Sequence, residues 1–234
     1  MILIPVIDLM HGQVVRAVRG NRLAYQPVVS ALCASSDPLT VAKTLCEHCA
    51  THQLYVADLD ALLGRPAQLV ALRLLLQGLP DMELWLDAGF ASASAADALR
   101  AELGTLATRV VPVFGSESLA SRGELERCFA AANADAVLSL DRRDGQRLDA
   151  AGCWEAPHLW PRRVIVMTLE RVGSDAGPDL ETLASVQLKS PSAFIVGAGG
   201  IRDSRDLARA SEAGAGAWLV ASALHDGRLP RVHA

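Results

Sequence analysis

Short runs of apolar residues recur along the chain, and each run ends in polar or small residues. Eight such runs lie at residues 2–8, 53–58, 83–89, 109–116, 136–141, 163–168, 193–200 and 217–222. Their apolar positions are continuous rather than alternating, which is typical of strands buried on both faces of a parallel sheet. The pattern therefore predicts eight parallel strands.

Most of the segments between these runs have the spacing of amphipathic helices. The segment after the first strand begins with Asp37 as a cap and Pro38 at the first helical position, which predicts a helix over residues 37–50. Further helices are predicted at residues 65–78, 92–104, 123–134, 177–190 and 203–215. Residues 142–157 lack the helical pattern and predict a long loop followed by a short helix.

Eight strands that alternate with helices predict a closed (β/α)8 barrel, with an open doubly wound sheet as the alternative. Because no linker or low-complexity stretch divides the chain, we expect a single barrel domain over residues 1–234. The two halves of the sequence also resemble each other, since a glycine stands four residues after Asp8, at Gly12, and four residues after Asp141, at Gly145. This correspondence after the first and fifth strands indicates a half-barrel internal repeat.

The composition narrows the class of protein. Of the 234 residues, 51% are hydrophobic and 21% are charged, which is typical of a globular domain. A formal net charge of −4 argues against a nucleic-acid partner, and no stretch is apolar for long enough to span a membrane. The 5 cysteines and the lack of a secretory signal favour a cytoplasmic protein with reduced thiols. We expect a monomer or a small homo-oligomer.

Small residues follow the third, fourth, seventh and eighth predicted strands. The last glycine-rich stretch does not match the dinucleotide fingerprint, because Arg202 occupies its third glycine position. A barrel phosphate loop is the better interpretation, with backbone N–H groups of Gly199, Gly200, Ala221 and Ser222 as donors. Arg202 is either a phosphate ligand or a solvated residue. The corresponding loops of the other half predict a second phosphate site, at Gly89, Gly115 and Ser116.

Four segments resemble a known family: IPVIDLMHGQVVRAVRG at 4–20, YVADLDA at 55–61, SLDRRDG at 139–145 and GAGGI at 197–201. In this order and at these strand positions they resemble the ProFAR isomerase family of histidine biosynthesis and its cyclase relatives. The resemblance implies a (β/α)8 barrel that rearranges a small phosphorylated aminoaldose into an aminoketose. It also implies that neither a metal nor a redox cofactor is needed.

The resemblance further implies roles for individual residues. Asp8 is expected to be the general base and Asp141 the general acid, while Thr168 positions the substrate and Trp154 stacks on one of its flat rings. The chemistry agrees, because ring opening needs a proton donated to oxygen and the rearrangement needs one removed from the adjacent carbon. Strands one and five face each other across an eight-stranded barrel, so the two carboxyl groups are expected to flank the substrate.

The segment after the third strand departs from the family, because Asp87 places a carboxylate where a phosphate would dock. Whether the substrate carries one phosphate or two is therefore left open. The segments YQPVVS, YVADLDA, GSES and SALHDGRL resemble a group of isomerase-related proteins associated with tetrahydromethanopterin and methanofuran biosynthesis. The alternatives are thus an enzyme of one-carbon cofactor synthesis, a cyclase-like barrel with a glutaminase partner, and a phosphate-ligand-binding barrel without catalysis.

Three further features have both a functional and a structural interpretation. One segment has metal-like spacing and contains Cys46, His48, Cys49 and His52. Because no second cysteine pair follows it, we expect no metal there. Arginines in the long loop after the first strand either clamp an anionic substrate or are solvated: Arg16, Arg19 and Arg22. Trp85 and Trp218 lie within predicted strands and are expected to be packing residues.

Overall fold

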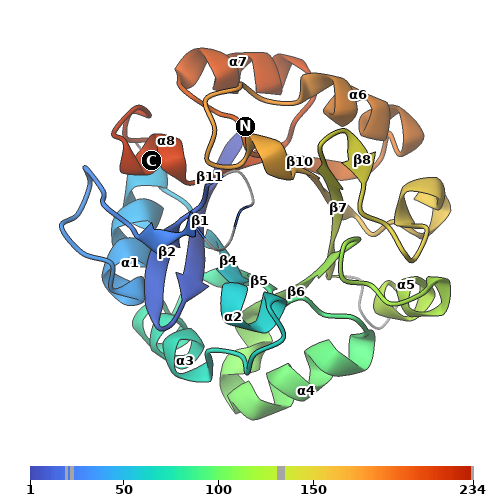
Figure 1. Ribbon diagram of the computed structural model, residues 1–234, viewed down its shortest axis with the longest axis horizontal. Helices are drawn as coiled ribbons and strands as arrows, with labels where there is room; N and C mark the ends of the chain where they lie inside the picture. The colour runs from blue at the N-terminus through green and yellow to red at the C-terminus, as the bar shows by residue number, and fades with distance from the viewer. Residues whose placement is uncertain (19–20, 22–23, 131–134, 233–234) are drawn as a thin grey trace.

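The structure, a computed structural model, describes residues 1–18, 21, 24–130 and 135–232. Parallel pairing runs from each barrel strand to the next, and the last strand pairs with the first, which closes the sheet (Figure 1). The eight predicted strands are confirmed, and the open sheet is excluded. They are β1 (Ile2–Met10), β4 (Gln53–Asp58), β5 (Glu83–Asp87), β6 (Val110–Gly115), β7 (Val137–Arg143), β9 (Arg163–Thr168), β10 (Phe194–Ala198) and β11 (Ala217–Val220).

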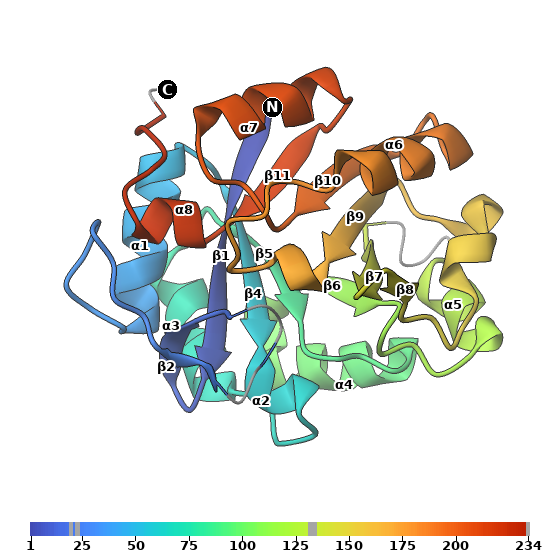
Figure 2. The same ribbon diagram turned by 45° about the horizontal axis from the view of Figure 1, so that its top comes forward.

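Helices surround the barrel on its outer face (Figures 1 and 2). The predicted helices are confirmed as α1 (Pro38–Cys49), α3 (Leu69–Gly78), α4 (Ala93–Leu103), α5 (Arg122–Cys128), α6 (Leu180–Lys189) and α7 (Ser204–Glu212). Helix α5 is shorter than predicted, and residues 131–134 of that prediction lie outside the described residues. Among the described helices, none combines the length and the apolar character that a membrane-crossing helix requires.

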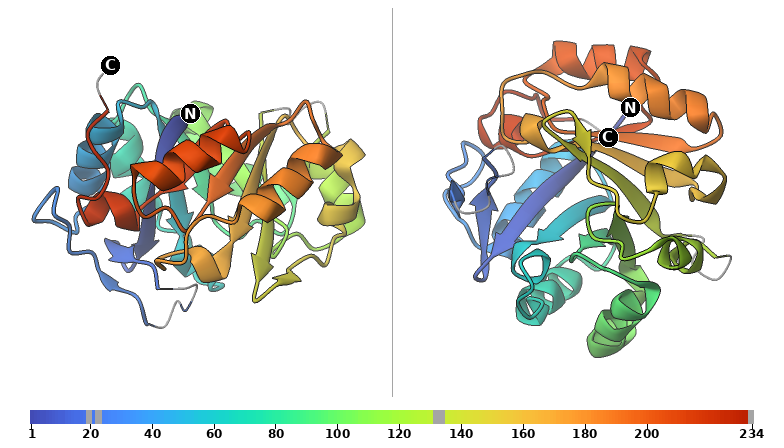
Figure 3. Two further views of the ribbon diagram at one scale, coloured as in Figure 1. Left: turned by 90° about the horizontal axis from the view of Figure 1, so that it is seen from above. Right: turned by 45° about the vertical axis from the view of Figure 1, so that its right-hand side comes forward.

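The connections after β7 and β11 are not full helices. After β7 the chain forms two single turns of 3₁₀ helix, η4 (Cys153–Glu155) and η5 (Pro157–Leu159), as the weak helical pattern there predicted. After β11 it forms the short helix α8 (Ser222–His225). Helices α6 and α7 lie side by side on one outer face, which the two further views also show (Figures 1 and 3).

Two hairpins extend the barrel strands on opposite sides of the mouth. Strand β1 turns through His11 and Gly12 into β2 (Gln13–Arg16), with φ angles of 51° and 76° at the turn. Strand β7 turns through Asp144 and Gly145 into β8 (Gln146–Arg147), with φ angles of 51° and 77°. Both turns need left-handed backbone, which Gly adopts at no steric cost. The repeated spacing of Asp and Gly in the sequence thus corresponds to a hairpin of the same kind in each half of the barrel.

The buried side chains form two layers, one inside the barrel and one between the sheet and the helices. The ring of Trp85 is fully buried inside the barrel, where the guanidinium carbon of Arg163 lies 5.1 Å from the ring centre. Trp218 belongs to the outer layer, and a Cβ at Gly197 would lie 2.2 Å from its ring. Both tryptophans are therefore packing residues, as predicted, and Gly197 is needed for core packing.

Candidate active site

A pocket of about 960 Å³, which includes solvent at its rim, lies where the barrel strands end. All eight barrel strands, or the residues directly after them, contribute to its lining. This is the end of the barrel at which (β/α)8 enzymes carry their active sites. The predicted residues Asp8, Asp141, Gly199, Gly200, Ala221 and Ser222 all line it.

Asp141, in strand β7, is held by donors from three neighbours. The Ser139 hydroxyl donates to Oδ1 at 2.6 Å, and the Glu117 N–H donates to Oδ2 at 3.1 Å. The Ser116 hydroxyl lies 3.5 Å from Oδ2 and accepts a hydrogen bond from the Asp141 N–H at 2.8 Å. The carboxyl group is therefore fixed in direction, and only 4% of Asp141 is exposed.

The surroundings of Asp141 favour its protonated form. Burial, followed by the charge of Glu117, raises the pKa of Asp141 to about 8, although hydrogen bonds from Ser139 and Glu117 act in the opposite direction. A carboxyl group with such a pKa carries a proton at neutral pH. Asp141 can thus donate a proton to a substrate oxygen.

Gly115 and Ser116 lie beside Asp141 and do not line the pocket among its described residues. A Cβ at position 115 would lie 2.9 Å from Oδ2 of Asp141, so Gly115 provides the space for that carboxyl group. Ser116 is fully buried, and its hydroxyl is bonded to Asp141. Both residues, which the sequence predicted as phosphate ligands, contact the candidate acid in this structure.

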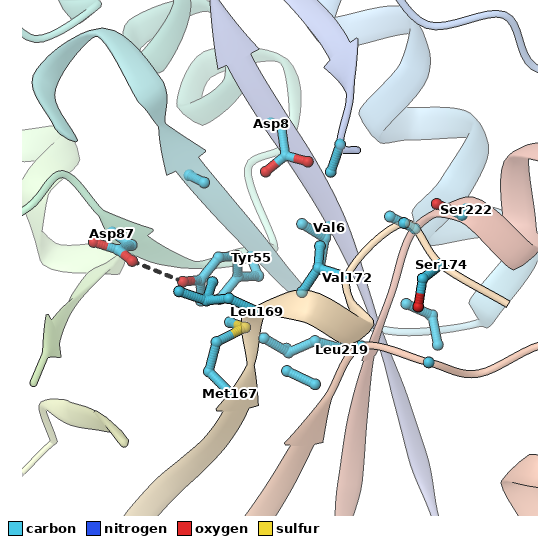
Figure 4. Close-up of a pocket in the computed structure, with 18 of the residues that line it drawn as sticks. Val6, Asp8, Tyr55, Asp87, Met167, Leu169, Val172, Ser174, Leu219 and Ser222 are labelled. Atoms are coloured by element: carbon cyan, nitrogen blue, oxygen red, sulfur yellow. Dashed lines mark hydrogen bonds between the residues drawn. The ribbon is translucent and has the colours of Figure 1, made fainter. Parts of the chain in front are cut away.

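Gly89 also lies outside the described pocket lining. Its N–H donates to Oδ1 of Asp87 at 3.1 Å, and a Cβ at this position would lie 3.2 Å from Leu62. Oδ2 of Asp87 accepts a hydrogen bond of 3.0 Å from the hydroxyl of Tyr55 (Figure 4). Asp87, the last residue of β5, therefore presents its carboxylate to the pocket.

Asp8 and the glycine loop after β10 occupy other parts of the same pocket. In Figure 4, Asp87 and Tyr55 lie on one side, Ser174 and Ser222 lie on the other, and Asp8 lies between them. Gly199 and Gly200 both have φ near +82°, and a Cβ at Gly200 would lie 2.1 Å from the carbonyl oxygen of Gly177. The glycines thus let the backbone after β10 approach the loop after β9 closely.

The structure does not bring Thr168 or Trp154 to the described pocket lining. The Thr168 hydroxyl donates to Oδ2 of Asp179 at 2.9 Å, and only 1% of the residue is exposed. Trp154 is packed in the outer core, with the guanidinium carbon of Arg147 5.0 Å from its ring centre. The residues on either side of Thr168, Met167 and Leu169, line the pocket in the place expected for Thr168.

Two other charged residues singled out in the sequence, Arg202 and Arg16, have protein partners. Arg202 forms a two-bond ion pair with Asp206, at 2.7 and 2.9 Å, which favours a structural role for this arginine. Arg16 pairs with Asp226 at 2.7 Å, while Arg19 and Arg22 lie outside the described residues.

The segment with metal-like spacing does not form a cluster of ligands. Burial raises the pKa of the Cys46 and Cys49 thiols to about 12, which opposes their ionisation. The His48 ring contacts the carbonyl oxygen of Leu229 at 3.0 Å, and His52 is exposed. Within the described ranges, no group of three or more His, Cys, Asp or Glu side chains has the geometry to hold a metal ion.

Residues 2–230 match the sequence model of the family described as "Histidine biosynthesis protein". The chain belongs to this family. It is 29% identical to the 1-(5-phosphoribosyl)-5-((5-phosphoribosylamino)methylideneamino) imidazole-4-carboxamide isomerase of Thermomicrobium roseum, over 98% of this chain and 94% of the relative. An isomerase of the same name from Thermus thermophilus is 30% identical, over 97% and 95% of the two chains. An uncharacterized protein of Methanocaldococcus jannaschii is 28% identical, over 97% and 94%.

In this member of the histidine biosynthesis protein family, sequence reasoning missed five polar residues of the pocket, Tyr25, Tyr55, Glu117, Arg143 and Ser174. Tyr55 lies in β4 within an apolar run, and Glu117 directly follows Ser116. Burial, followed by the charges of Asp87 and Asp141, raises the pKa of Tyr55 well above its ordinary value. A hydroxyl inside an otherwise apolar strand was the one available signal for Tyr55. Glu117 carried none, because its importance depends on its distance to Asp141.

Proposed function

We propose that this chain is a sugar-phosphate isomerase that converts an aminoaldose into an aminoketose by an Amadori-type rearrangement. The observation that carries the proposal is the buried carboxyl group of Asp141, which shares one pocket with the carboxyl group of Asp8 and whose pKa is raised to about 8 by burial and by Glu117. Membership of the histidine biosynthesis protein family, and relatives that carry the name of an isomerase, support it.

The two carboxyl groups can perform the rearrangement without an added reagent. Asp141 gives its proton to the ring oxygen, the carbon–oxygen bond breaks, and the nitrogen lone pair forms the iminium. Asp8 then removes the proton from the adjacent carbon, which gives an enaminol. Return of that proton to the first carbon, with transfer of the hydroxyl proton back to Asp141, gives the ketone and restores both residues.

Positioning supplies the other part of the proposed catalysis. Gly199, Gly200, Ala221 and Ser222 line one side of the pocket, and their backbone N–H groups are of the kind that binds phosphate in barrel loops. A phosphate held there would fix one end of the substrate. The reacting carbons would then lie between Asp8 and Asp141 rather than sample the whole pocket.

Conversion of an N-substituted phosphoribosylamine, followed by NMR of the sugar carbons, tests this function. We expect the wild-type protein to form the aminoketose phosphate. The test includes the relatives' substrate, whose name contains two phosphoribosyl groups, and an analogue with one. Thermal stabilisation of the protein by these compounds, with no product from either, would contradict the isomerase and favour a ligand-binding barrel.

A further inference from the structure

Arg143, the last residue of strand β7, contributes a guanidinium group to the pocket. Among the described residues that line the pocket, it is the one basic side chain. Successive side chains of a strand point to opposite faces, so Asp141 and Arg143 share the inner face. Arg142, between them, bonds instead to Asp179 and Thr182 at the start of helix α6. The strand therefore carries the proposed acid and an arginine on the same face.

One nitrogen of this guanidinium group lacks a partner. Nε of Arg143 is buried and has no hydrogen-bond partner within the described part of the chain. Arg202 shows the ordinary structural case, because its Nε donates to Asp206 at 2.7 Å. Buried polar atoms are nearly always hydrogen-bonded, and an exception is often found where a protein binds a ligand or acts on it. A ligand in the pocket would supply the missing acceptor.

The chemistry of a guanidinium group determines what that acceptor is. The group has donors only, so its partner has to present acceptor atoms. Nε and a neighbouring Nη donate in parallel, which matches two oxygens of a carboxylate or a phosphate. A neutral carbonyl oxygen would satisfy one donor and leave the positive charge without a counterion. We therefore expect an anionic oxygen group at Arg143.

Arg143 lies apart from the other two functional parts of the pocket. Strands β9 and β10 separate β7 from β11, which is followed by Ser222 of the proposed phosphate site. The described hydrogen bonds to the carboxyl group of Asp141 come from residues other than Arg143. Arg143 is thus available to a part of the substrate other than its phosphate and its reacting carbons. In the proposed orientation, that part is the substituent on the nitrogen.

The second phosphate site that the sequence predicted lies elsewhere. Gly89, Gly115 and Ser116 all lie outside the described pocket lining. They belong to the region after β5 and β6, whereas Arg143 ends β7. A second anion in the described pocket would therefore be bound by a side chain, in contrast to the backbone N–H groups proposed for the first.

We propose that the substituent on the substrate's nitrogen carries an anionic oxygen group, a carboxylate or a phosphate, and that Arg143 binds this group. The inference rests on the proposed function, because it uses the same pocket and the same orientation of the substrate. It makes Arg143 the residue that selects among aminoaldose phosphates by the charge of their nitrogen substituent.

Binding of three compounds tests this inference without turnover. Each has a phosphate at one end of the same short alkyl chain, and the other end is a hydroxyl, a carboxylate or a second phosphate. By calorimetry at neutral pH, we expect both compounds with a second anion to bind about tenfold more tightly than the alcohol, a typical magnitude for a charge-assisted hydrogen bond. The tighter of the two identifies the anionic group. Binding of the alcohol as tight as that of the other two, or no measurable binding of any compound, would overturn the proposal.

Two variants of Arg143 assign the anion site. Arg143→Gln removes the charge and is expected to abolish the preference for a second anion. Arg143→Lys keeps the charge without the paired donors and is expected to keep part of the preference.

Lys43→Gln is the matched control, because it also removes one positive charge, from an exposed residue of helix α1 outside the pocket lining. We expect the wild-type preference in this variant. A preference of wild-type size in Arg143→Gln would contradict the assignment. If Arg143→Gln does not fold, the full preference in Arg143→Lys would contradict it instead.

The binding series and the turnover assay fail separately. A preference that depends on Arg143, in a protein that isomerises no aminoaldose phosphate, would keep the anion site and remove the proposed isomerase. Equal kcat/KM for phosphoribosylamines with a neutral and with an anionic nitrogen substituent would do the reverse.

Discussion

At the scale of single residues, Asp141 is the group on which most of the proposed chemistry depends. Its carboxyl group combines deep burial with three donors, from Ser139, Glu117 and Ser116. The sequence predicted Asp8 and Asp141 as a pair because both end strands that face each other. It could not predict that Gly115 and Ser116 serve Asp141, since a glycine and a serine after a strand are equally typical of a phosphate loop.

The raised pKa of Asp141 predicts how the proposed catalysis depends on pH. The proposed acid is active only when protonated, and its pKa is raised to about 8 by burial and by Glu117. We therefore expect the turnover number to fall as the pH rises through about 8. A profile of turnover against pH checks this, and activity that stays level far above that pH would contradict the role of Asp141.

The same pKa predicts an effect on stability that needs no substrate. The folded state binds the Asp141 proton more tightly than the unfolded chain, whose carboxyl pKa is near 3.8. This contribution is complete below pH 3.8 and is lost as the pH rises toward about 8. Relative to Asp141→Asn, the wild type should lose up to about 1.4 kcal/mol of unfolding free energy per pH unit over that range. Urea unfolding at several pH values measures the difference, and a constant difference would contradict the assignment.

Gly115 offers a test of the space around the acid. In Gly115→Ala the new Cβ would lie 2.9 Å from Oδ2 of Asp141, so the carboxyl group must move. We expect the turnover number to fall at least tenfold, since small displacements of a catalytic group are costly. Gly123→Ala is the control, because its Cβ would lie 3.5 Å from the flexible side chain of Arg127. Equal activity of both variants would show that the position of Asp141 is not critical.

At the scale of elements, hydrophobic runs located every barrel strand, because strands buried on both faces need continuous apolar residues. The caps Asp37, Ser92 and Asp203 explain why the predicted helices begin where they do. The short elements β2 and β8 were missed, although a residue followed by glycine marks both turns. Strands β2 and β8, of four and two residues, are too short for a periodic pattern, so only the turn signal was available.

The contact between the loops after β9 and β10 predicts the effect of one substitution. In Gly200→Ala the Cβ would lie 2.1 Å from the Gly177 carbonyl oxygen, at a φ of +82°. Both effects oppose folding, and we expect a loss of about 1–3 kcal/mol of unfolding free energy together with weaker phosphate binding. Gly214→Ala has a similar φ of +92° but meets nothing nearer than 4.0 Å, so it isolates the strain of the backbone. Urea unfolding that gave equal losses would exclude the loop contact as a cause.

At the scale of the whole molecule, the barrel consists of two similar halves that differ at the ends of β5 and β10. Opposite strands β1 and β7 carry Asp8 and Asp141, and each continues into a hairpin of the same kind. The loop after β10 keeps its glycines, whereas strand β5 ends in Asp87, which lines the pocket. The framework was predictable from repeated sequence features. The charge of the pocket was not, because it arises from residues of strands and loops that meet only in the closed barrel.

The central claim, an acid–base pair formed by Asp8 and Asp141, is tested most directly by turnover of an aminoaldose phosphate in Asp8→Asn and Asp141→Asn. We predict that each variant loses about a hundredfold to ten-thousandfold in turnover number while phosphate binding is kept, because each loses one proton transfer. Asp97→Asn, exposed on α4, should keep the wild-type rate. Wild-type turnover in either Asp8→Asn or Asp141→Asn would contradict the account.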